Sequence, residues 1–517
     1  MSASTEKKLR REAREAGIDK KAEAAKAAAE KKAKTNRRWT LVGAGVAVLV
    51  IVALLLGSGL PYMSTAYTVG NEKFSASEVN YHYGSQFNSF ANQYGSYASI
   101  FGLDISNGPV GLEDQECYMM AEGGSWKDYF LDAAKNAMIQ TVALKAYADE
   151  HGITVSDEEI ADVASYFEGL EESVTAYGYS TVDQFFAANY GAGVDKDMVY
   201  EGFVDSALCA KVIDEVSAGF TYTEAELEEQ YKSYNGEQDI YEYLYYFVAA
   251  ETVETEGEDG ETTSEVTEDT LKAAQTKAEA VVEAFAKAEG EDLEAKFNEA
   301  ILSVDVNGYA TEQRSSGASI IAAKDWMLDS ARQAGDISSE LNSTETGYYV
   351  VVFAEHDDNH YNMAQVRHIL VKALADENGV YTDEAKAAAK ADAEAILAEF
   401  LAGDKSEESF AALAEIYSED EGSYLNGGLY DNVAKGQMVE EFDAFCFEGH
   451  KKGDTAVVYG ESSAYAGYHV MYFVGEGQQY SDYIAETDLR NAATSAWLEE
   501  LMAQYETGEG FGMKLVG

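Results

Sequence analysis

The chain has few prolines, cysteines and histidines. Its 2 prolines among 517 residues fall far below the average usage of ~5%, which excludes proline-rich linkers and polyproline ligand motifs. The 3 cysteines, Cys117, Cys209 and Cys446, are odd in number and widely spaced, so the sequence supports neither a disulfide framework nor a cysteine-based zinc site. The 7 histidines lack the spacing of metal ligands, and we expect no metal.

Apolar residues, by contrast, are plentiful. Hydrophobic residues make up 46% of the chain and aromatic residues 12%, which is enough for packed cores and excludes a disordered protein. At ~150 residues per domain, the length predicts three or four domains. Because proline-rich connectors are absent, short or acidic segments are expected to join them.

Positive charge is concentrated at the N-terminus. Residues 1–38 contain 13 Lys+Arg and 6 Asp+Glu, a net +7, so the rest of the chain must carry −63 to give the total of −56. Residues 40–60 are uncharged and long enough to cross ~30 Å of hydrocarbon. We therefore expect a transmembrane helix at 39–60, a cytoplasmic N-terminus and extracytoplasmic domains after the span. A cleaved signal peptide is the alternative, since small residues follow at 64–66.

The basic segment shows little sign of nucleic-acid binding. No aromatic residues are interleaved with its Lys and Arg residues, and it precedes the apolar run directly. This pattern favours contact with anionic lipid over nucleic acid. We expect a membrane partner through a single span, and no nucleic acid.

Residues 61–238 follow a helical pattern. Three candidate capping boxes mark helix starts: Ser156 with Glu159, Thr181 with Gln184, and Thr223 with Glu226. Spacings of four and three residues predict one buried helix face: Phe130, Ala134, Ala137, Thr141, Leu144 and Ala148. The many Tyr and Phe residues of this region are expected mainly in the core, with a groove for unfolded chain as the alternative.

An internal duplication follows the helical region. The motif "AEAVVEAF" at 278–285 matches "AEAILAEF" at 393–400, and the segment 335–353 echoes 453–473. Each copy runs from a β-rich strand through an Ala-rich helix and a shorter helix to a Gly-Asp turn and a closing strand.

The bounds of the two copies predict the domain organisation of this part of the chain. The two modules cover 239–358 and 362–477, and an acidic insertion at 251–269 in the first is expected to be a solvated loop. A C-terminal helix and tail occupy 478–517, of which 480–507 are expected to complete the helical domain.

The second copy resembles a known family. The ordered motifs "VRHILV", "FAALAEIYSEDEGSYLNGG", "KGQMVEEFDAFCF", "KKGD" and "GYHVMYF" within 362–475 look like those of a parvulin-type (PpiC) peptidyl-prolyl cis-trans isomerase. The helical region is similar to the SurA-like chaperone domain of membrane-attached and periplasmic bacterial foldases. With the predicted span, the expected fold class is α+β: a transmembrane helix, a helical chaperone domain and two tandem parvulin-like domains. Each of these domains is expected to be a four-stranded antiparallel sheet with helices, the first one degenerate.

The resemblance also implies catalytic residues. His368 and His469 fall at the family's paired-histidine positions, where two buried imidazoles can fix each other's tautomer through shared hydrogen bonds. Asp420 falls where the family carries Cys or Asp near the substrate carbonyl. In the first copy Tyr245 and Tyr349 replace both histidines, so we expect that copy to be non-catalytic.

Four further residues are expected at the proline pocket. Met438 and Phe442 match the family's pocket positions, Leu429 is expected to add a wall, and Phe447 to pack nearby. Two departures from the family point to low activity. The turn "GGLYD" replaces "GGDLG", and Ala466 stands where a Ser or Thr hydroxyl often lies near the second histidine.

The resemblance implies isomerisation of X–Pro bonds without a cofactor. No nucleophile is needed, because such an enzyme gains by binding the twisted amide more tightly than the planar forms. Expected partners are unfolded or partly folded secreted or envelope proteins with unphosphorylated X–Pro bonds, and the acidic ectodomain favours neutral or basic ones. The alternative is a catalytically lapsed holdase chaperone or a surface-binding protein. The sequence indicates neither the clients nor the oligomeric state.

Overall fold

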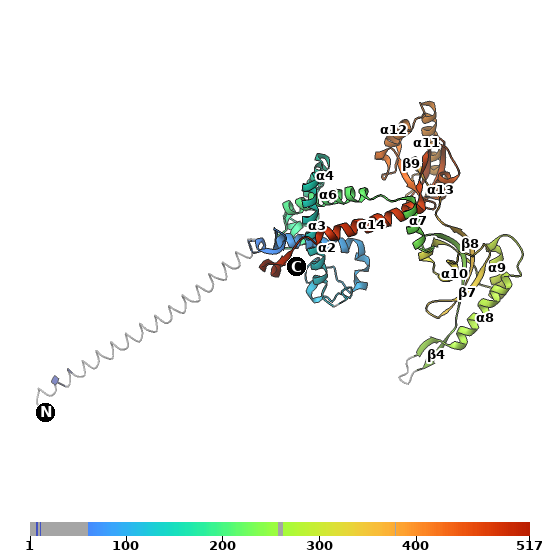
Figure 1. The fold of residues 1–517 in the computed structure, drawn as a ribbon, viewed down its shortest axis with the longest axis horizontal. Helices are drawn as coiled ribbons and strands as arrows, with labels where there is room; N and C mark the ends of the chain where they lie inside the picture. The colour runs from blue at the N-terminus through green and yellow to red at the C-terminus, as the bar shows by residue number, and fades with distance from the viewer. Residues whose placement is uncertain (1–6, 9–10, 12–59, 122, 257–261, 378) are drawn as a thin grey trace. The chain divides into compact units, whose positions relative to one another are not determined.

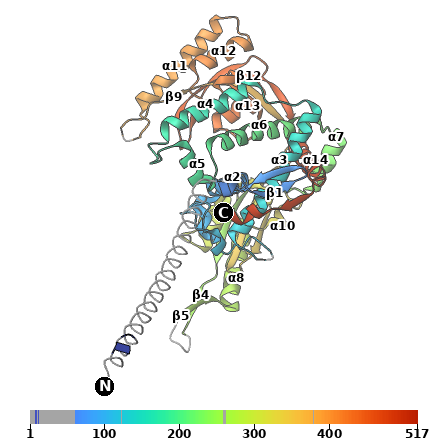
Figure 2. The same ribbon diagram turned by 90° about the vertical axis from the view of Figure 1, so that its left-hand side faces the viewer.

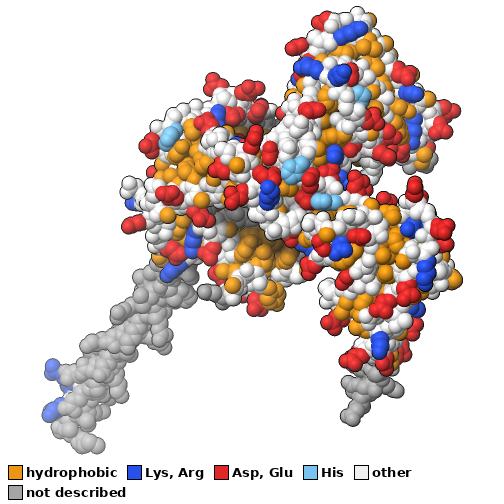
Figure 3. All heavy atoms as spheres, turned by 45° about the vertical axis from the view of Figure 1, so that its right-hand side comes forward, with side chains coloured by type: hydrophobic (Ala, Val, Ile, Leu, Met, Phe, Trp, Pro, Cys, Tyr) orange, Lys and Arg blue, Asp and Glu red, His pale blue; other side chains and the backbone are white. Residues whose placement is uncertain are grey.

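The computed structural model describes residues 60–517 except 122, 257–261 and 378, together with residues 7, 8 and 11 (Figures 1 and 2). Two compact units make up the chain: one contains residues up to Phe220 together with Ala493–Gly517, and the other is Thr221–Ala492. Asp and Glu side chains predominate among the charged groups on the face shown in Figure 3, as expected from 93 acidic and 37 basic residues.

The first unit combines helices with a small antiparallel sheet of order β13-β1-β2. Its strands are β1 (Thr65–Val69), β2 (Glu72–Ser75) and β13 (Thr507–Glu509). Its α-helices are α2 (Ala76–Tyr94), α3 (Trp126–His151), α4 (Asp157–Ser173), α5 (Val182–Tyr190) and α6 (Lys196–Gly219). Short 3-10 helices are η1 (Leu60–Met63), η2 (Gly95–Phe101), η3 (Leu112–Asp114) and η6 (Phe511–Leu515). The sequence gives no sign of this sheet, because it pairs Tyr67 with Glu509 from the far end of the chain.

Polar caps begin the predicted helices. At Ser156 and Thr223 the hydroxyl accepts the third amide of the helix and the glutamate at that position returns the bond, so both predicted boxes are confirmed. At Thr181 the hydroxyl accepts the Gln184 amide, but the Gln184 side chain accepts the amide of Ser180, so this box is only half formed.

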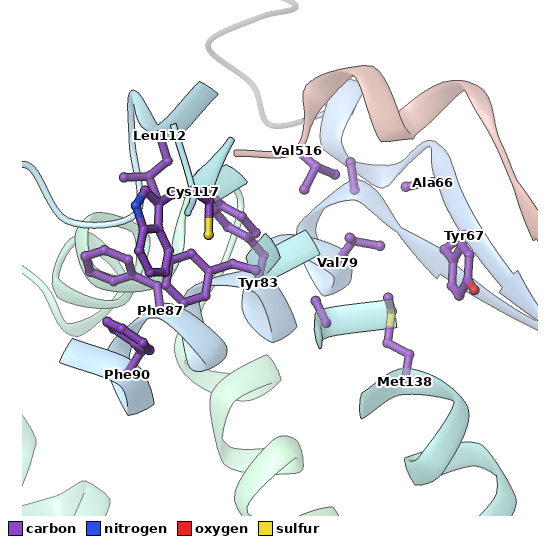
Figure 4. Packing of buried hydrophobic residues seen from close by; sticks show 14 of the residues in the cluster. Ala66, Tyr67, Val79, Tyr83, Phe87, Phe90, Leu112, Cys117, Met138 and Val516 are labelled. Carbon is purple, nitrogen blue, oxygen red and sulfur yellow. The ribbon is translucent and has the colours of Figure 1, made fainter. Parts of the chain in front are cut away.

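An aromatic cluster forms the core of the first unit. Trp126 and Phe130 of α3 stack with ring centroids 5.6 Å apart, and the Phe90 ring of α2 lies 5.2 Å from that of Trp126. Figure 4 shows Phe87 and Phe90 of α2 pointing into the same cluster as Leu112. Aromatic residues of this region therefore serve mainly as core, as the sequence predicts.

The predicted apolar face of α3 is confirmed only in part. Phe130, Ala134, Leu144 and Ala148 are buried, whereas Ala137 and Thr141 are half-buried. Met138 is fully buried in place of Ala137. Near the middle of the helix, Ala137 and Thr141 are therefore partly accessible to solvent.

The second unit begins with α7 (Glu224–Ser233) and contains two four-stranded sheets. The first sheet has the order β6-β3-β8-β7, with β3 (Ile240–Ala249), β6 (Thr311–Ser316), β7 (Ile337–Leu341) and β8 (Gly347–Asp357). Its helices are α8 (Glu268–Phe285), α9 (Leu293–Val304), α10 (Lys324–Met327) and the 3-10 turn η4 (Gly317–Ser319).

The acidic insertion in this module is not a loop, contrary to the prediction. It forms an antiparallel hairpin of β4 (Thr252–Glu256) and β5 (Thr262–Val266). Thr and Val residues recur in both strands, and their β-branched side chains favour extended backbone despite the acidic neighbours.

The second sheet has the order β10-β9-β12-β11, with β9 (Asn362–Lys372), β10 (Leu429–Val433), β11 (Thr455–Glu461) and β12 (Ala466–Gln479). Its helices are α11 (Asp383–Ala402), α12 (Glu407–Tyr417), the 3-10 turn η5 (Tyr424–Asn426) and α13 (Glu440–Phe447). Helices α11 and α12 pack on one face of this sheet and α13 on the other (Figure 2). The last helix, α14 (Tyr480–Met502), follows β12 directly.

The two sheets share their strand order and register, which confirms the duplication. In the second sheet His368 pairs with Met471, and His469 with Leu370. In the first sheet Tyr245 pairs with Val351, and Tyr349 with Phe247. Tyr245 and Tyr349 therefore occupy the positions that the two histidines hold in the second sheet, as the sequence alignment predicts.

The transmembrane helix of the predicted fold class is a wrong prediction. Across the residues that the structure describes, no helix is both long and apolar enough to cross a membrane. Even α3, the longest helix among the described residues, carries charges such as Asp132, Lys135 and Lys145 along its length. For the residues that the structure describes, the fold class is α+β, and the single-pass membrane localisation and membrane partner that depended on the span are not retained. The predicted span at 39–60 lies, apart from Leu60, outside the described residues.

The aromatic core generates a stability prediction. Phe130→Ala should lower the free energy of unfolding of the first unit by about 3–5 kcal/mol, because it removes a buried ring that its neighbours cannot replace. Tyr97, whose side chain is 59% exposed, provides the control, and Tyr97→Ala should change stability by less than ~0.5 kcal/mol. Urea unfolding followed by tryptophan fluorescence measures both, and equal stabilities would contradict this core.

Candidate active site

Two histidines meet on the face of the second sheet that α13 covers. His368 lies in β9 and His469 in β12. Val366 and Met471 of the α13 core are two residues away from them along these strands, so the histidines share that face of the sheet. The two Nδ1 atoms are 3.0 Å apart, and each residue is only 3% exposed. The structure thus brings the two predicted histidines into direct contact.

Asp420 lies on the other side of His368. Its Oδ2 atom is 3.0 Å from His368 Nε2 and 3.1 Å from the Tyr430 hydroxyl, and it also accepts the Ser423 hydroxyl. The hydrogen bond from His368 holds the pKa of Asp420 well below its usual range, against the opposing effect of partial burial, and those from Ser423 and Tyr430 add to this. Asp420 is therefore an ionised acceptor at neutral pH.

A tyrosine hydroxyl completes a row of hydrogen-bonded groups. The Tyr465 hydroxyl is 3.0 Å from His469 Nε2, so a polar row runs through Asp420, His368, His469 and Tyr465. Burial, followed by the nearby His368, lowers the pKa of His469 to about 3, and this ring is neutral at pH 7.

Only one proton can lie between the two Nδ1 atoms. When His368 is neutral, it donates from Nε2 to Asp420 and accepts from His469, and Tyr465 donates to His469. When His368 carries two protons, it donates to both neighbours, and His469 donates to the Tyr465 oxygen. The tyrosine hydroxyl can serve either state, so each ring nitrogen has a partner throughout.

An apolar wall adjoins the polar row. The Phe442 ring centroid is 5.4 Å from that of His368 and 5.3 Å from that of His469, with its plane nearly perpendicular to both. The Tyr430 ring lies 5.2 Å from His368, and Met438 is half-buried in the same core cluster. Met438, Phe442 and Tyr430 are the residues of this wall; Phe442 is buried, and Met438 and Tyr430 are half-buried beside it.

Leu429, a predicted pocket residue, lies elsewhere. β10 pairs Leu429 with Arg367 and Tyr430 with Val366. Directly paired residues share a face of the sheet, so Leu429 lies with Arg367 on the face opposite the histidines. Its neighbour Tyr430 lies beside His368 instead.

Phe447 is also displaced from the histidines. It ends α13, and its ring contacts Tyr361 with centroids 5.6 Å apart. Tyr361 immediately precedes β9, whereas His368 lies in the second half of that strand. Phe447 thus supports the opposite end of the α13 core.

Two glycines allow the backbone to approach the histidines. A Cβ at Gly428 would lie 2.1 Å from the His368 carbonyl oxygen, and one at Gly460 would lie 2.6 Å from His469 Nε2. Gly427 and Gly428 have φ of 71° and 72°, which favours glycine. The altered turn "GGLYD" therefore keeps the two glycines that the close approach requires.

Sequence reasoning missed three hydroxyl groups of the site: Ser423, Tyr430 and Tyr465. The only available signal is spacing, since Ser423 follows Asp420 by three residues. Ala466 has no hydroxyl to offer His469, but the hydroxyl of the adjacent Tyr465 contacts that histidine.

Both ring nitrogens of each histidine are engaged in hydrogen bonds within the polar row. Over the described part of the chain, no three His, Cys, Asp or Glu side chains are grouped to hold a metal ion. The arrangement places an apolar wall against a fixed polar network.

The first sheet lacks this network. Tyr245 and Tyr349 occupy the equivalent positions, with ring centroids 5.8 Å apart in an edge-on contact. The described residues show no hydrogen bond between these two side chains.

The lowered pKa of His469 predicts a pH dependence. The pKa of His469 is near 6.5 in the unfolded state and about 3 in the folded state. At pH values between these two, the unfolded state binds a proton that the folded state excludes, so stability is lost as the pH falls below about 6.5. From pH 7 to 4.5 the wild type should lose about 2–3 kcal/mol more than His469→Phe. Calorimetric unfolding at both pH values measures this, and an equal loss in the two proteins would contradict a neutral His469.

Comparison with known proteins gives a family for this part of the chain. Residues 348–473, from β8 to β12, match the family of the PPIC-type PPIASE domain. The chain is 35% identical over 118 residues to Chaperone SurA of Alkalilimnicola ehrlichii, which covers 22% of this chain and 25% of the relative. The match thus spans a quarter of the length of that relative.

Solved structures of similar proteins were also found. PrsA from Bacillus subtilis is 14% identical over 76% of this chain and 92% of its own, with a TM-score of 0.28. The peptidylprolyl isomerase PrsA from Bacillus anthracis is 20% identical over 28% of this chain and 59% of its own, with a TM-score of 0.18. By its family match, the chain carries a parvulin-type peptidyl-prolyl cis-trans isomerase domain.

Proposed function

We propose that the protein is a foldase, in which the second module, 362–477, isomerises X–Pro bonds of unfolded or partly folded chains. The first unit and the first module, 239–358, would hold those chains as a chaperone. The observation that carries the proposal is the contact of Phe442 with both rings of a buried histidine pair that Asp420 and Tyr465 fix at its two ends.

The chemistry follows from the X–Pro bond itself. Amide resonance opposes rotation with a barrier of ~18–20 kcal/mol, so a catalyst must bind the twisted amide more tightly than the planar forms. In this proposal the proline ring rests on Met438, Phe442 and Tyr430, while the rest of the peptide turns about the bond. The polar row beneath keeps the Phe442 and Tyr430 rings in place, and Asp420 faces the substrate carbonyl.

Charge would influence the choice of client. The chain has 93 acidic and 37 basic residues, and long-range attraction favours neutral or basic segments over acidic ones. The substrate class is thus proposed to be unphosphorylated, non-acidic X–Pro segments.

A catalytically lapsed holdase is the second candidate, and the first module favours it. That module keeps the sheet while both histidines are tyrosines, so the fold persists in this chain without the polar row. A holdase would bind unfolded chains through such surfaces without accelerating isomerisation.

A peptide assay separates the two candidates. The full chain at micromolar concentration should accelerate cis–trans exchange in an Ala-X-Pro-Phe peptide, measured by NMR exchange spectroscopy. Met438→Ala removes half-buried apolar surface at ~25 cal/mol per Å² and should lower kcat/KM about fivefold or more with little change in Tm. If the wild type does not accelerate this exchange, the foldase proposal fails and the holdase is the remaining candidate.

His368→Ala should act mainly through stability. It leaves His469 Nδ1 without a partner and removes one of three hydrogen bonds to the Asp420 Oδ2 atom, at a cost of about 1–3 kcal/mol in the free energy of unfolding. Tm should therefore fall for this variant and hold for Met438→Ala. A His368→Ala protein that keeps its Tm but loses all turnover would contradict the supporting role, since the histidine would then act on the substrate directly.

Tyr465→Phe tests the end of the polar row. It removes one hydroxyl and leaves His469 Nε2 unpaired, which should cost about 1 kcal/mol of stability and lower kcat/KM severalfold. The neighbouring Tyr468→Phe is the control, because Tyr468 lies next to His469 and so points to the other face of the sheet. Equal effects of the two substitutions would show that the Tyr465 hydroxyl does not support the histidines.

A further inference from the structure

The first unit contains a cleft that the proposed isomerase site does not use. It lies between β2, α2, α3 and α6 and has a volume of about 540 Å³. The small side chains Ala137, Thr141 and Ala146 of α3 line it; Ala137 and Thr141 belong to the predicted apolar face and are half-buried, and Ala146 is exposed. The cleft is thus built into the helix packing of this unit.

His82 of α2 lines the cleft with an unused imidazole. Its ring packs edge-on against Phe74 and Tyr81, with centroids 6.0 and 5.2 Å away. Neither ring nitrogen has a hydrogen-bond partner among the residues that the structure describes, and the residue is half-buried. Burial lowers the pKa of His82 to about 4, so the ring is neutral and offers one donor and one acceptor.

A peptide backbone supplies the matching groups. Each residue of an extended chain presents one N–H and one C=O, and these can pair with the two nitrogens of a neutral imidazole. Phe74, Val142 and Met198 provide apolar surface in the same cleft for adjoining side chains.

The charged residues of the cleft select the sign of the ligand. Lys145 is paired with Asp205 at 2.7 Å, and the Glu78 carboxylate accepts the Ser75 amide. Three further acids line the cleft, Glu72, Asp149 and Glu201; they are exposed and form no ion pair within the described residues. The lining contains one further lysine, Lys73. The rim therefore favours a cation.

We propose that this cleft binds an extended segment of non-native chain in which a Lys or Arg adjoins apolar residues. The imidazole of His82 binds the backbone, the apolar lining takes the neighbouring side chains, and Asp149 and Glu201 attract the cationic group. The inference rests on the proposed chaperone function and gives it a preference for basic segments.

Two proline-free peptides test the proposal. Fluorescein-labelled Gly-Ser-Leu-Lys-Leu-Ser-Gly and the same peptide with norleucine for lysine are titrated with the full chain, and anisotropy gives each Kd. The lysine peptide should bind about tenfold more tightly at low salt, and this advantage should shrink at 0.5 M salt. Equal affinity for the two peptides would overturn the proposed preference.

Matched variants locate the site. Asp149→Asn with Glu201→Gln should weaken lysine-peptide binding about fivefold and leave the norleucine peptide unchanged. The control, Asp162→Asn with Glu168→Gln, removes the same charge from exposed positions of α4 and should have no effect. Equal weakening by both pairs would assign the effect to net charge and overturn the site.

His82→Phe separates the backbone contact from the charge contact. It keeps an aromatic ring against Phe74 and Tyr81 but removes both nitrogens, so it should weaken both peptides by a similar factor of about five or more. Unchanged binding would contradict the role of His82, provided that circular dichroism shows the fold intact. X–Pro isomerisation is measured in the same variants and should be unaffected. If the wild type shows no X–Pro isomerisation but binds the peptides as expected, the proposed isomerase function is wrong and the proposed cleft stands.

Discussion

The contact between the Nδ1 atoms of His368 and His469 is the constraint on which the candidate site depends. It exists only because β9 and β12 pair in one register, since a shift of either strand by one residue would turn its histidine to the α11 face and separate the two rings. Each ring then needs one further partner, which Asp420 and Tyr465 provide. The glycines at 428 and 460 follow from the same contact, because a side chain at either would displace a histidine.

The first sheet shows that this fold forms without the histidine pair. Its strand order and register match those of the second sheet, yet Tyr245 and Tyr349 stand in place of the histidines. Tyrosines fill the space by packing, as their 5.8 Å edge-on contact shows, and need no row of partners. The polar row of the second sheet is therefore not required for folding, which supports a functional reason for it.

Much of this organisation was predictable from the sequence, because the duplication and the helix caps are local or repeated patterns and the two histidines lie in motifs that resemble a known family. The side-chain partners were not. Leu429 and Tyr430 are adjacent residues, and only the pairing of β10 with β9 decides which one faces His368. Tyr465, like the β1–β13 pairing, depends on contacts that no local period encodes. The pairing of residues 252–256 with 262–266 was missed because acidic composition outweighed their β-branched residues.

The most direct test of the account is where a proline ring binds. Methionine methyl groups of the full chain are labelled with carbon-13, and Met438 is assigned by its loss in Met438→Leu. The account predicts that an Ala-Pro-containing peptide shifts the Met438 resonance and shows transfer of magnetisation from its proline ring protons to that methyl group. The same peptide with alanine for proline should do neither. A proline peptide that is isomerised while the Met438 signal stays unmoved would contradict the proposed site.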